Sequence, residues 1–226
     1  MVDSNINFND GFTLLVDKKL DWTSFDVVKK IRNMTGSKKV GHAGTLDPLA
    51  SGLLIICTGK HTKKINDFQN LHKEYSGKFI IGASTPSHDL ETEIENTKSI
   101  SGINKNDLNK IVDSFLGCQL QRPPKFSAVK VDGKRAYELA RKEKDVKIKE
   151  KKIKINEFKI LNFSLPEIKF YISCSKGTYI RSIARDLGEK LGCGAYLSEL
   201  RRTKIGSFCV DNAYTIEELE QKINKD

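Results

Sequence analysis

The stretch Gly41-His42-Ala43-Gly44-Thr45-Leu46-Asp47-Pro48-Leu49-Ala50-Ser51-Gly52-Leu53-Leu54 leads directly into the apolar run Ile55-Ile56-Cys57. Its glycines permit backbone conformations that other residues resist, and Pro48 disfavours the helical region for Asp47. We therefore predict that Asp47 lies on a shaped loop at the end of a buried strand. A carboxylate held in this way can act as a nucleophile, a general base or a metal ligand, whereas the alternative is an acid that only forms a turn.

Composition places limits on the kind of protein this is. The 226 residues include 38% hydrophobic and 30% charged residues, a balance typical of a soluble globular protein with a sizeable core. No apolar run approaches the length of a membrane span, and the N-terminus lacks the features of a signal peptide, so we expect a cytoplasmic protein with no membrane partner. The net charge of +10 favours a polyanionic partner but is equally compatible with a lysine-rich surface that serves solubility.

The five cysteines are too widely spaced for the usual cysteine sites. None forms a C-x-x-C pair, and the odd count argues against a disulfide framework. We therefore expect most of them to be small apolar side chains in a reducing compartment, and we expect neither a metal nor a cofactor.

Hydrophobic periodicity predicts short strands alternating with a few helices. In the first helix, which Thr23 or Ser24 begins and Gly36 ends, Phe25, Val28 and Ile31 recur at helical spacing and are expected in the core. Lys18 and Lys19, just before it, are expected on a solvated surface. The other expected elements are strands near residues 11–16, 53–57, 75–81, 153–160 (an edge strand) and 168–174, and helices near 62–68, 104–117, 180–191 and from 215 onward.

Three further segments carry candidate chemistry. Lys73-Glu74-Tyr75 begins a strand whose alternation puts Tyr75 on one face, as a core tyrosine or a site residue. Gln121 to Arg141 combines a proline-stiffened entry, a strand, an Asp-Gly turn and a basic helix start. Cys174-Ser175-Lys176-Gly177-Thr178-Tyr179-Ile180-Arg181 places Arg181 in the first turn of a helix, where the helix dipole opposes a cation, which hints at a partner carboxylate.

Taken in order with Leu200-Arg201-Arg202-Thr203, these segments resemble the motifs of the TruB-type tRNA pseudouridine synthases. The resemblance implies an α+β protein with the pseudouridine synthase fold: a mixed, mostly antiparallel sheet, flanking helices and a central cleft. It also implies that residues 1–226 form a single catalytic domain with an RNA-binding insertion at about 122–154. The chain ends at Asp226, so we expect no C-terminal PUA-like domain, and we expect a monomer.

The family resemblance also assigns the site. Asp47 is the expected catalytic aspartate, Arg181 pairs with it and keeps it ionised, and Tyr75 packs against the target base. The enzyme would isomerise uridine 55 in the T loop of tRNA after that nucleotide leaves its stack. Residues expected to bind the RNA substrate are His42, Lys73, Tyr179, Leu200, Arg122, Lys125, Lys130, Arg135 and Arg141.

One motif departs from the family pattern, and some roles stay open. Where the family has Thr-Asp-Thr-x-Asp, this chain has Thr85-Pro86-Ser87-His88-Asp89, so the role of the middle aspartate cannot be transferred. The acidic loop 89–95 is expected to be a solvated turn. His42 is either a stacking residue for a displaced base or a loop histidine with a backbone partner. Two other functions remain possible: a pseudouridine synthase for another RNA, including one directed by a guide RNA, or a non-catalytic RNA-binding module or tRNA chaperone.

Overall fold

The structure is a computed structural model that describes residues 7–127, 130–131, 134–135 and 148–223. The chain divides into two compact units. Unit 1 comprises Met1–Tyr75 and Leu200–Asp226, and unit 2 comprises Ser76–Glu199. Strands β4 (Lys73–Ile81) and β10 (Ala195–Ile205) each contribute residues to both units. Among the described residues, no helix is both long and apolar enough to span a membrane.

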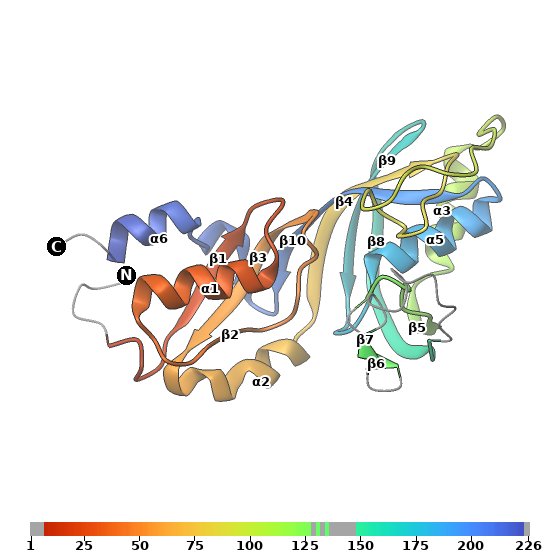
Figure 1. The fold of residues 1–226 in the computed structure, drawn as a ribbon. Coiled ribbons are helices and arrows are strands. Elements are labelled where there is room, and N and C mark those ends of the chain that lie inside the picture. The colour runs from red at the N-terminus through yellow and green to blue at the C-terminus, as the bar shows by residue number, and fades with distance from the viewer. Residues whose placement is uncertain (1–6, 128–129, 132–133, 136–147, 224–226) are drawn as a thin grey trace. The chain divides into compact units, whose positions relative to one another are not determined.

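Unit 1 is a layered α/β arrangement (Figure 1). Its strand order is β1-β3-β10-β4, with β2 paired to β3 and β11 to β10. Besides the shared strands, its elements are β1 (Thr13–Lys18), α1 (Ser24–Thr35), β2 (Val40–His42), β3 (Ala50–Thr58), η1 (Gly59–Lys64), α2 (Ile65–Asn70), β11 (Phe208–Cys209), η2 (Val210–Asn212) and α6 (Ile216–Ile223).

The core of unit 1 lies on both faces of β3, because its apolar run points alternate side chains to opposite sides. Leu54 and Ile56 join Val28 and Ile31 of α1 and Leu219 of α6 in one cluster. On the opposite face, a second cluster contains Leu53, Ile55 and Cys57 and packs against residues of α2. The prediction that Phe25 belongs to the core is wrong, because its side chain is 63% exposed at the edge of the apolar stripe of α1.

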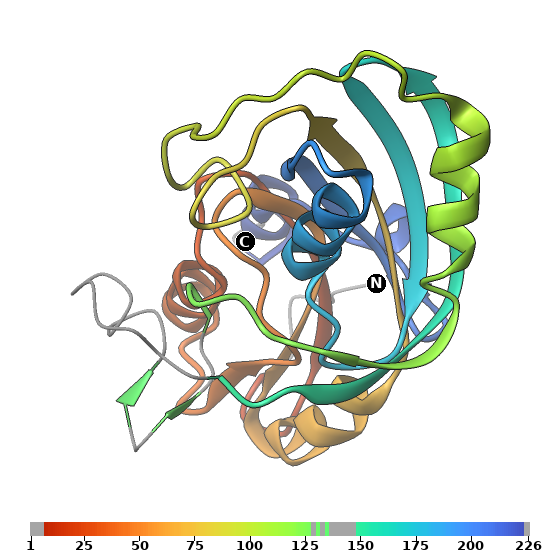
Figure 2. The same ribbon diagram turned by 90° about the vertical axis from the view of Figure 1, so that its right-hand side faces the viewer.

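Unit 2 is built on the strand order β10-β4-β9-β8-β5. Its own elements are α3 (Lys105–Asp113), β5 (Gly117–Gln121), β6 (Lys130–Val131), β7 (Lys134–Arg135), β8 (Lys151–Ser164), β9 (Glu167–Cys174) and α5 (Ile180–Leu191). Helix α3 lies alongside β8 (Figure 2). Phe79 of β4 stacks on Phe170 of β9, with 4.0 Å between ring centroids, and Phe158 of β8 packs against both rings.

The predicted α+β fold with a mixed, mostly antiparallel sheet is confirmed. Strands β1 and β2 run antiparallel to β3, β8 runs antiparallel to both β5 and β9, and β10 runs parallel to β3. The expectation of an edge strand near 153–160 is wrong, since β8 lies between β9 and β5. Strands β6 and β7 pair antiparallel on either side of the predicted Asp-Gly turn, which itself lies outside the described residues. The basic helix start at 136–141 lies outside the described residues.

Candidate active site

The segment that carries Asp47 is a loop between β2 and β3, as predicted. The amide of Ala50 donates a hydrogen bond to the Asp47 carbonyl oxygen at 3.1 Å, which closes a turn over Pro48. Gly44 has φ 97°, a conformation that favours glycine. Asp47 itself is half-buried, so its carboxylate is held near the surface of unit 1 by a shaped backbone.

Arg202 of β10 anchors the first half of this loop. It is 1% exposed, and its guanidinium donates to the carbonyl oxygens of Leu53 at 2.8 Å, Gly44 at 3.1 Å and Thr45 at 3.3 Å. Gly52, opposite Arg202 in the parallel register, has φ 104°, and a Cβ there would lie 2.3 Å from the Arg202 carbonyl oxygen. The motif therefore needs glycine at position 52 so that β3 and β10 can approach closely.

Lys18 anchors the second half of the loop. Its ammonium group donates to the carbonyl oxygens of Trp22 at 2.6 Å, Lys19 at 3.0 Å and Pro48 at 3.4 Å. The expected solvated position of Lys18 is wrong, because the side chain is fully buried. Burial lowers the pKa of Lys18 to about 8, although the attraction of Asp47 raises it. That attraction also favours the ionised form of the carboxylate.

A serine hydroxyl joins α1 to the same loop. The Ser24 hydroxyl donates to the Leu46 carbonyl oxygen at 3.0 Å and accepts from the Leu46 amide at 2.8 Å. Thr23 begins the helix with a capping box, in which its hydroxyl accepts from the Asp26 amide at 3.0 Å and Asp26 accepts from the Thr23 amide at 2.9 Å. The start of α1 is thereby fixed against the residue next to Asp47.

The remaining site predictions in unit 1 concern β2, β4 and β10. His42 is half-buried, its buried Nδ1 has no hydrogen-bond partner among the described residues, and burial lowers the pKa of its imidazole. Leu200 pairs in the sheet with Ala50, and Ala50 is three residues after Asp47 in the sequence. Tyr75 is 9% exposed. Lys73 is buried, and its ammonium group donates to the Gln69 and Leu71 carbonyl oxygens, at 2.6 Å each.

In unit 2, Arg181 lies in the first turn of α5 and is 4% exposed. Its Nε lies 3.4 Å from Oδ2 of Asp89, which is also buried. Arg181 therefore has a carboxylate partner in Asp89, which is not the residue predicted for that role. The expectation that Asp89 lies in a solvated turn is wrong. Asp47 belongs to the other unit, and its pairing with Arg181 stays a prediction.

A buried glutamine that the sequence did not single out positions Tyr179. The Gln121 side chain donates to the Tyr179 carbonyl oxygen at 3.1 Å and accepts from the Tyr179 amide at 2.9 Å. The only signal in the sequence was that Gln121 begins the proline-containing segment. Next to it, Arg122 is exposed and pairs with Glu150 at 3.3 Å. Lys125 is exposed too, while the side chains of Lys130, Arg135 and Arg141 fall outside the described residues.

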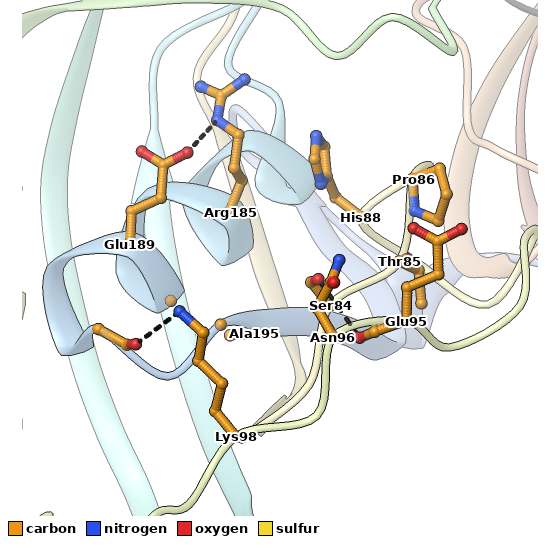
Figure 3. A pocket seen from close by; sticks show the side chains of 13 residues that line it. Ser84, Thr85, Pro86, His88, Glu95, Asn96, Lys98, Arg185, Glu189 and Ala195 are labelled. Carbon is orange, nitrogen blue, oxygen red and sulfur yellow. Dashed lines mark hydrogen bonds and ion pairs between the residues drawn. The ribbon is translucent and has the colours of Figure 1, made fainter.

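A cavity of about 530 Å³ opens beside α5, one helical turn beyond Arg181 (Figure 3). His88 lies on one side of it, and its pKa is lowered to about 4 by burial and by the positive charges of Arg185 and Arg181. Arg185 lies 3.9 Å from Glu189, and Lys98 donates to the Gly192 carbonyl oxygen. The lining of the cavity therefore includes charged side chains of both signs. No group of side chains suited to hold a metal ion occurs in the described part of the chain.

Comparison with known proteins covers nearly the whole chain. The model of the TruB family pseudouridylate synthase N-terminal domain matches residues 32–180, and that of the tRNA pseudouridylate synthase B C-terminal domain matches residues 181–226. The chain is 50% identical over 221 residues to tRNA pseudouridine synthase B of Flavobacterium johnsoniae, which covers 95% of this chain and 96% of the relative. It is 49% identical to the enzyme of the same name from Phocaeicola vulgatus, with 97% and 100% covered.

Solved structures show the same fold. A chain in the crystal structure of a Cbf5-Nop10-Gar1 complex matches with a TM-score of 0.73 and 26% identity, over 95% of this chain and 55% of that chain. A chain in the structure of an H/ACA RNP bound to a substrate RNA containing 2'-deoxyuridine matches with a TM-score of 0.71 and 24% identity, over 95% and 54%. The present chain thus spans about half the length of these two solved chains.

Proposed function

The chain belongs to the TruB family of pseudouridylate synthases, and we propose that it converts uridine 55 in the T loop of tRNA to pseudouridine. The isomerisation breaks the N1–C1′ bond, rotates the uracil and forms a C5–C1′ bond, while the proton on C5 is lost and N1 gains one. The reaction has no net redox change and needs no group donor. The protein must therefore extrude the nucleotide, hold it and supply an ionised acid.

The observation that carries the proposal is the way in which Asp47 is held. Two buried cations, Lys18 and Arg202, bind carbonyl oxygens on either side of it, and Ser24 fixes the residue before it. A turn-forming aspartate needs no buried cations, whereas a reacting carboxylate needs a fixed position and a stabilised charge. In the proposal, Asp47 is the essential carboxylate.

The other predicted residues take supporting roles in this proposal. Arg181 supplies a further cation for the Asp47 carboxylate, and Tyr75 packs against the extruded base. His42 fits a stacking role, since its lowered pKa leaves a neutral imidazole at neutral pH. Exposed Arg122 and Lys125 contact the phosphates of the T arm. The protein acts as a monomer in the cytoplasm.

The test is pseudouridine mapping in a T-arm stem-loop and in bulk tRNA after incubation with the pure protein. We expect modification at position 55, and we expect Asp47→Asn to abolish it while RNA binding persists. Modification elsewhere in tRNA, or in another RNA alone, would reject the proposed target. Tight binding with no modification would identify an RNA-binding or chaperone module instead, and turnover by Asp47→Asn would remove Asp47 from the chemistry.

A further inference from the structure

The first turn of α1 exposes an aromatic ring close to the catalytic loop. Phe25 is 63% exposed, although the residue before it, Ser24, is buried and holds Leu46 through two hydrogen bonds. Burying a phenylalanine side chain normally stabilises a fold. An aromatic ring left in solvent one residue from a group that positions the Asp47 loop thus contributes little to the core, and its surface is accessible to a partner.

Two exposed cations continue from Phe25 along the same helix face. Phe25, Lys29 and Arg32 are spaced i, i+4 and i+7, so they align on one side of α1 over ~10 Å. In the described part of the chain, neither Lys29 nor Arg32 forms an ion pair, whereas the neighbouring Lys30 pairs with Glu220 at 2.6 Å. We call Phe25, Lys29 and Arg32 the α1 face.

Asp26, the residue after Phe25, is already engaged in the helix cap. Asp26 accepts hydrogen bonds from the amide and the hydroxyl of Thr23, at 2.9 and 2.6 Å. These hydrogen bonds lower the pKa of Asp26, and the positive charge of Lys29 lowers it further by a smaller amount. The carboxylate therefore serves the helix cap, and the two cations of the α1 face keep their charge available for an anionic partner.

An aromatic ring followed by cations at the spacing of a helix face is suited to unpaired nucleic acid. Bases stack on aromatic side chains, and the phosphates that follow them attract lysine and arginine. An acidic protein surface would match the cations but would offer no flat base for the ring. Because the Asp47 loop is anchored to Ser24, a strand lying on the α1 face would continue from the reacting nucleotide.

We propose that the α1 face binds the RNA strand adjacent to the target uridine: Phe25 stacks on an unpaired base of the T loop, and Lys29 and Arg32 contact its phosphates. This inference rests on the proposed function, which supplies the RNA. It adds a substrate-binding surface on unit 1 to the predicted cations of residues 122–154.

The stacking contact is tested by equilibrium binding of a T-arm stem-loop to proteins that carry Asp47→Asn, so that no turnover intervenes. Phe25→Ala should raise Kd roughly tenfold, and Phe25→Tyr should restore the wild-type value because it keeps the ring. Leu20→Ala is the matched control, since Leu20 is also an exposed apolar side chain of unit 1, at 54%. It should leave Kd unchanged. Equal Kd values for Phe25→Ala and Leu20→Ala would overturn the stacking contact.

The phosphate contacts are tested by the dependence of Kd on salt. Replacing Lys29 and Arg32 with glutamine should reduce the slope of log K against log[salt] by roughly 1.5 to 2, because two counterion-releasing contacts are lost. The same replacement at Lys63 and Lys64, exposed on η1, should not change the slope. Equal slopes for the two double variants would overturn the phosphate contacts. If the wild-type protein modifies the T arm and all these variants bind it normally, only the proposed role of the α1 face is refuted. If the wild-type protein neither binds nor modifies the T arm, the proposed function is refuted as well.

Discussion

Buried Lys18 should make the stability of unit 1 rise with pH in a defined window. Its pKa is lowered from 10.5 to about 8 in the folded protein, so between these values the unfolded chain binds more protons than the folded one. The free energy of unfolding therefore increases as pH rises through this window, and it is insensitive to Lys18 below it. For these two pKa values the linkage relation gives a gain of about 2.5 kcal/mol between pH 7 and pH 10.

Lys18→Met isolates this effect, because it removes the titrating group and keeps the length of the side chain. Urea unfolding can be followed through the fluorescence of Trp22, the single tryptophan of the chain, whose carbonyl oxygen accepts from Lys18. The difference in unfolding free energy between wild type and Lys18→Met should shift by about 2.5 kcal/mol in favour of the wild type from pH 7 to pH 10. Other titrating groups cancel in this difference. If the unfolding free energies of the two proteins keep a constant difference from pH 7 to pH 10, Lys18 is not desolvated. Its role as a buried anchor of the Asp47 loop would then be refuted.

Two further substitutions test the anchors of each unit. Gly52→Ala should destabilise unit 1 by roughly 2–4 kcal/mol in urea unfolding, because its Cβ would lie 2.3 Å from the Arg202 carbonyl oxygen. The control Gly36→Ala, at a glycine with φ 60° and open space around it, should cost about 1 kcal/mol. Similar losses of stability for the two variants would contradict the close approach of β3 and β10. Asp89→Asn removes the carboxylate charge 3.4 Å from the buried Arg181 guanidinium and should lower the free energy of unfolding by about 3 kcal/mol, so an unchanged melting temperature would refute the buried pair.

Local patterns in the sequence predicted many of the helices and strands, whereas the pseudouridine synthase fold was predicted from the family resemblance. The apolar run of β3, the alternation in β9 and the helical spacing in α5 each identify their element without tertiary information. Strand β10 was missed, because Glu199, Arg201, Arg202 and Lys204 fall on both faces of its second half and obscure any alternation. The loop that bears Asp47 was predicted because glycine and proline act on the backbone locally.

The buried charges of the site were harder to predict, since their partners are distant in sequence. Lys18 is an instructive case: Leu14, Val16 and Lys18 alternate on the buried face of β1, so extending the predicted strand by two residues would have turned Lys18 inward. Lysine side chains are mostly exposed in proteins, and this tendency argues against the inward position that the alternation indicates. Asp89 gave no comparable signal, because its partner Arg181 lies more than ninety residues away along the chain.

The anchors of the Asp47 loop place stability and activity in opposition. Desolvating Lys18 costs stability at neutral pH, yet its ammonium group is the donor that holds Pro48 and the charge that favours an ionised Asp47. Raising the pH through about 8 relieves that cost and, at the same step, removes the cation beside the carboxylate. A fold selected for stability alone would place an apolar side chain at position 18, as core packing does at positions 14 and 16 of the same strand face. A charge retained there despite its cost fits a site organised around a reacting carboxylate, because functional sites are where a chain departs from the rules that stabilise the rest of it.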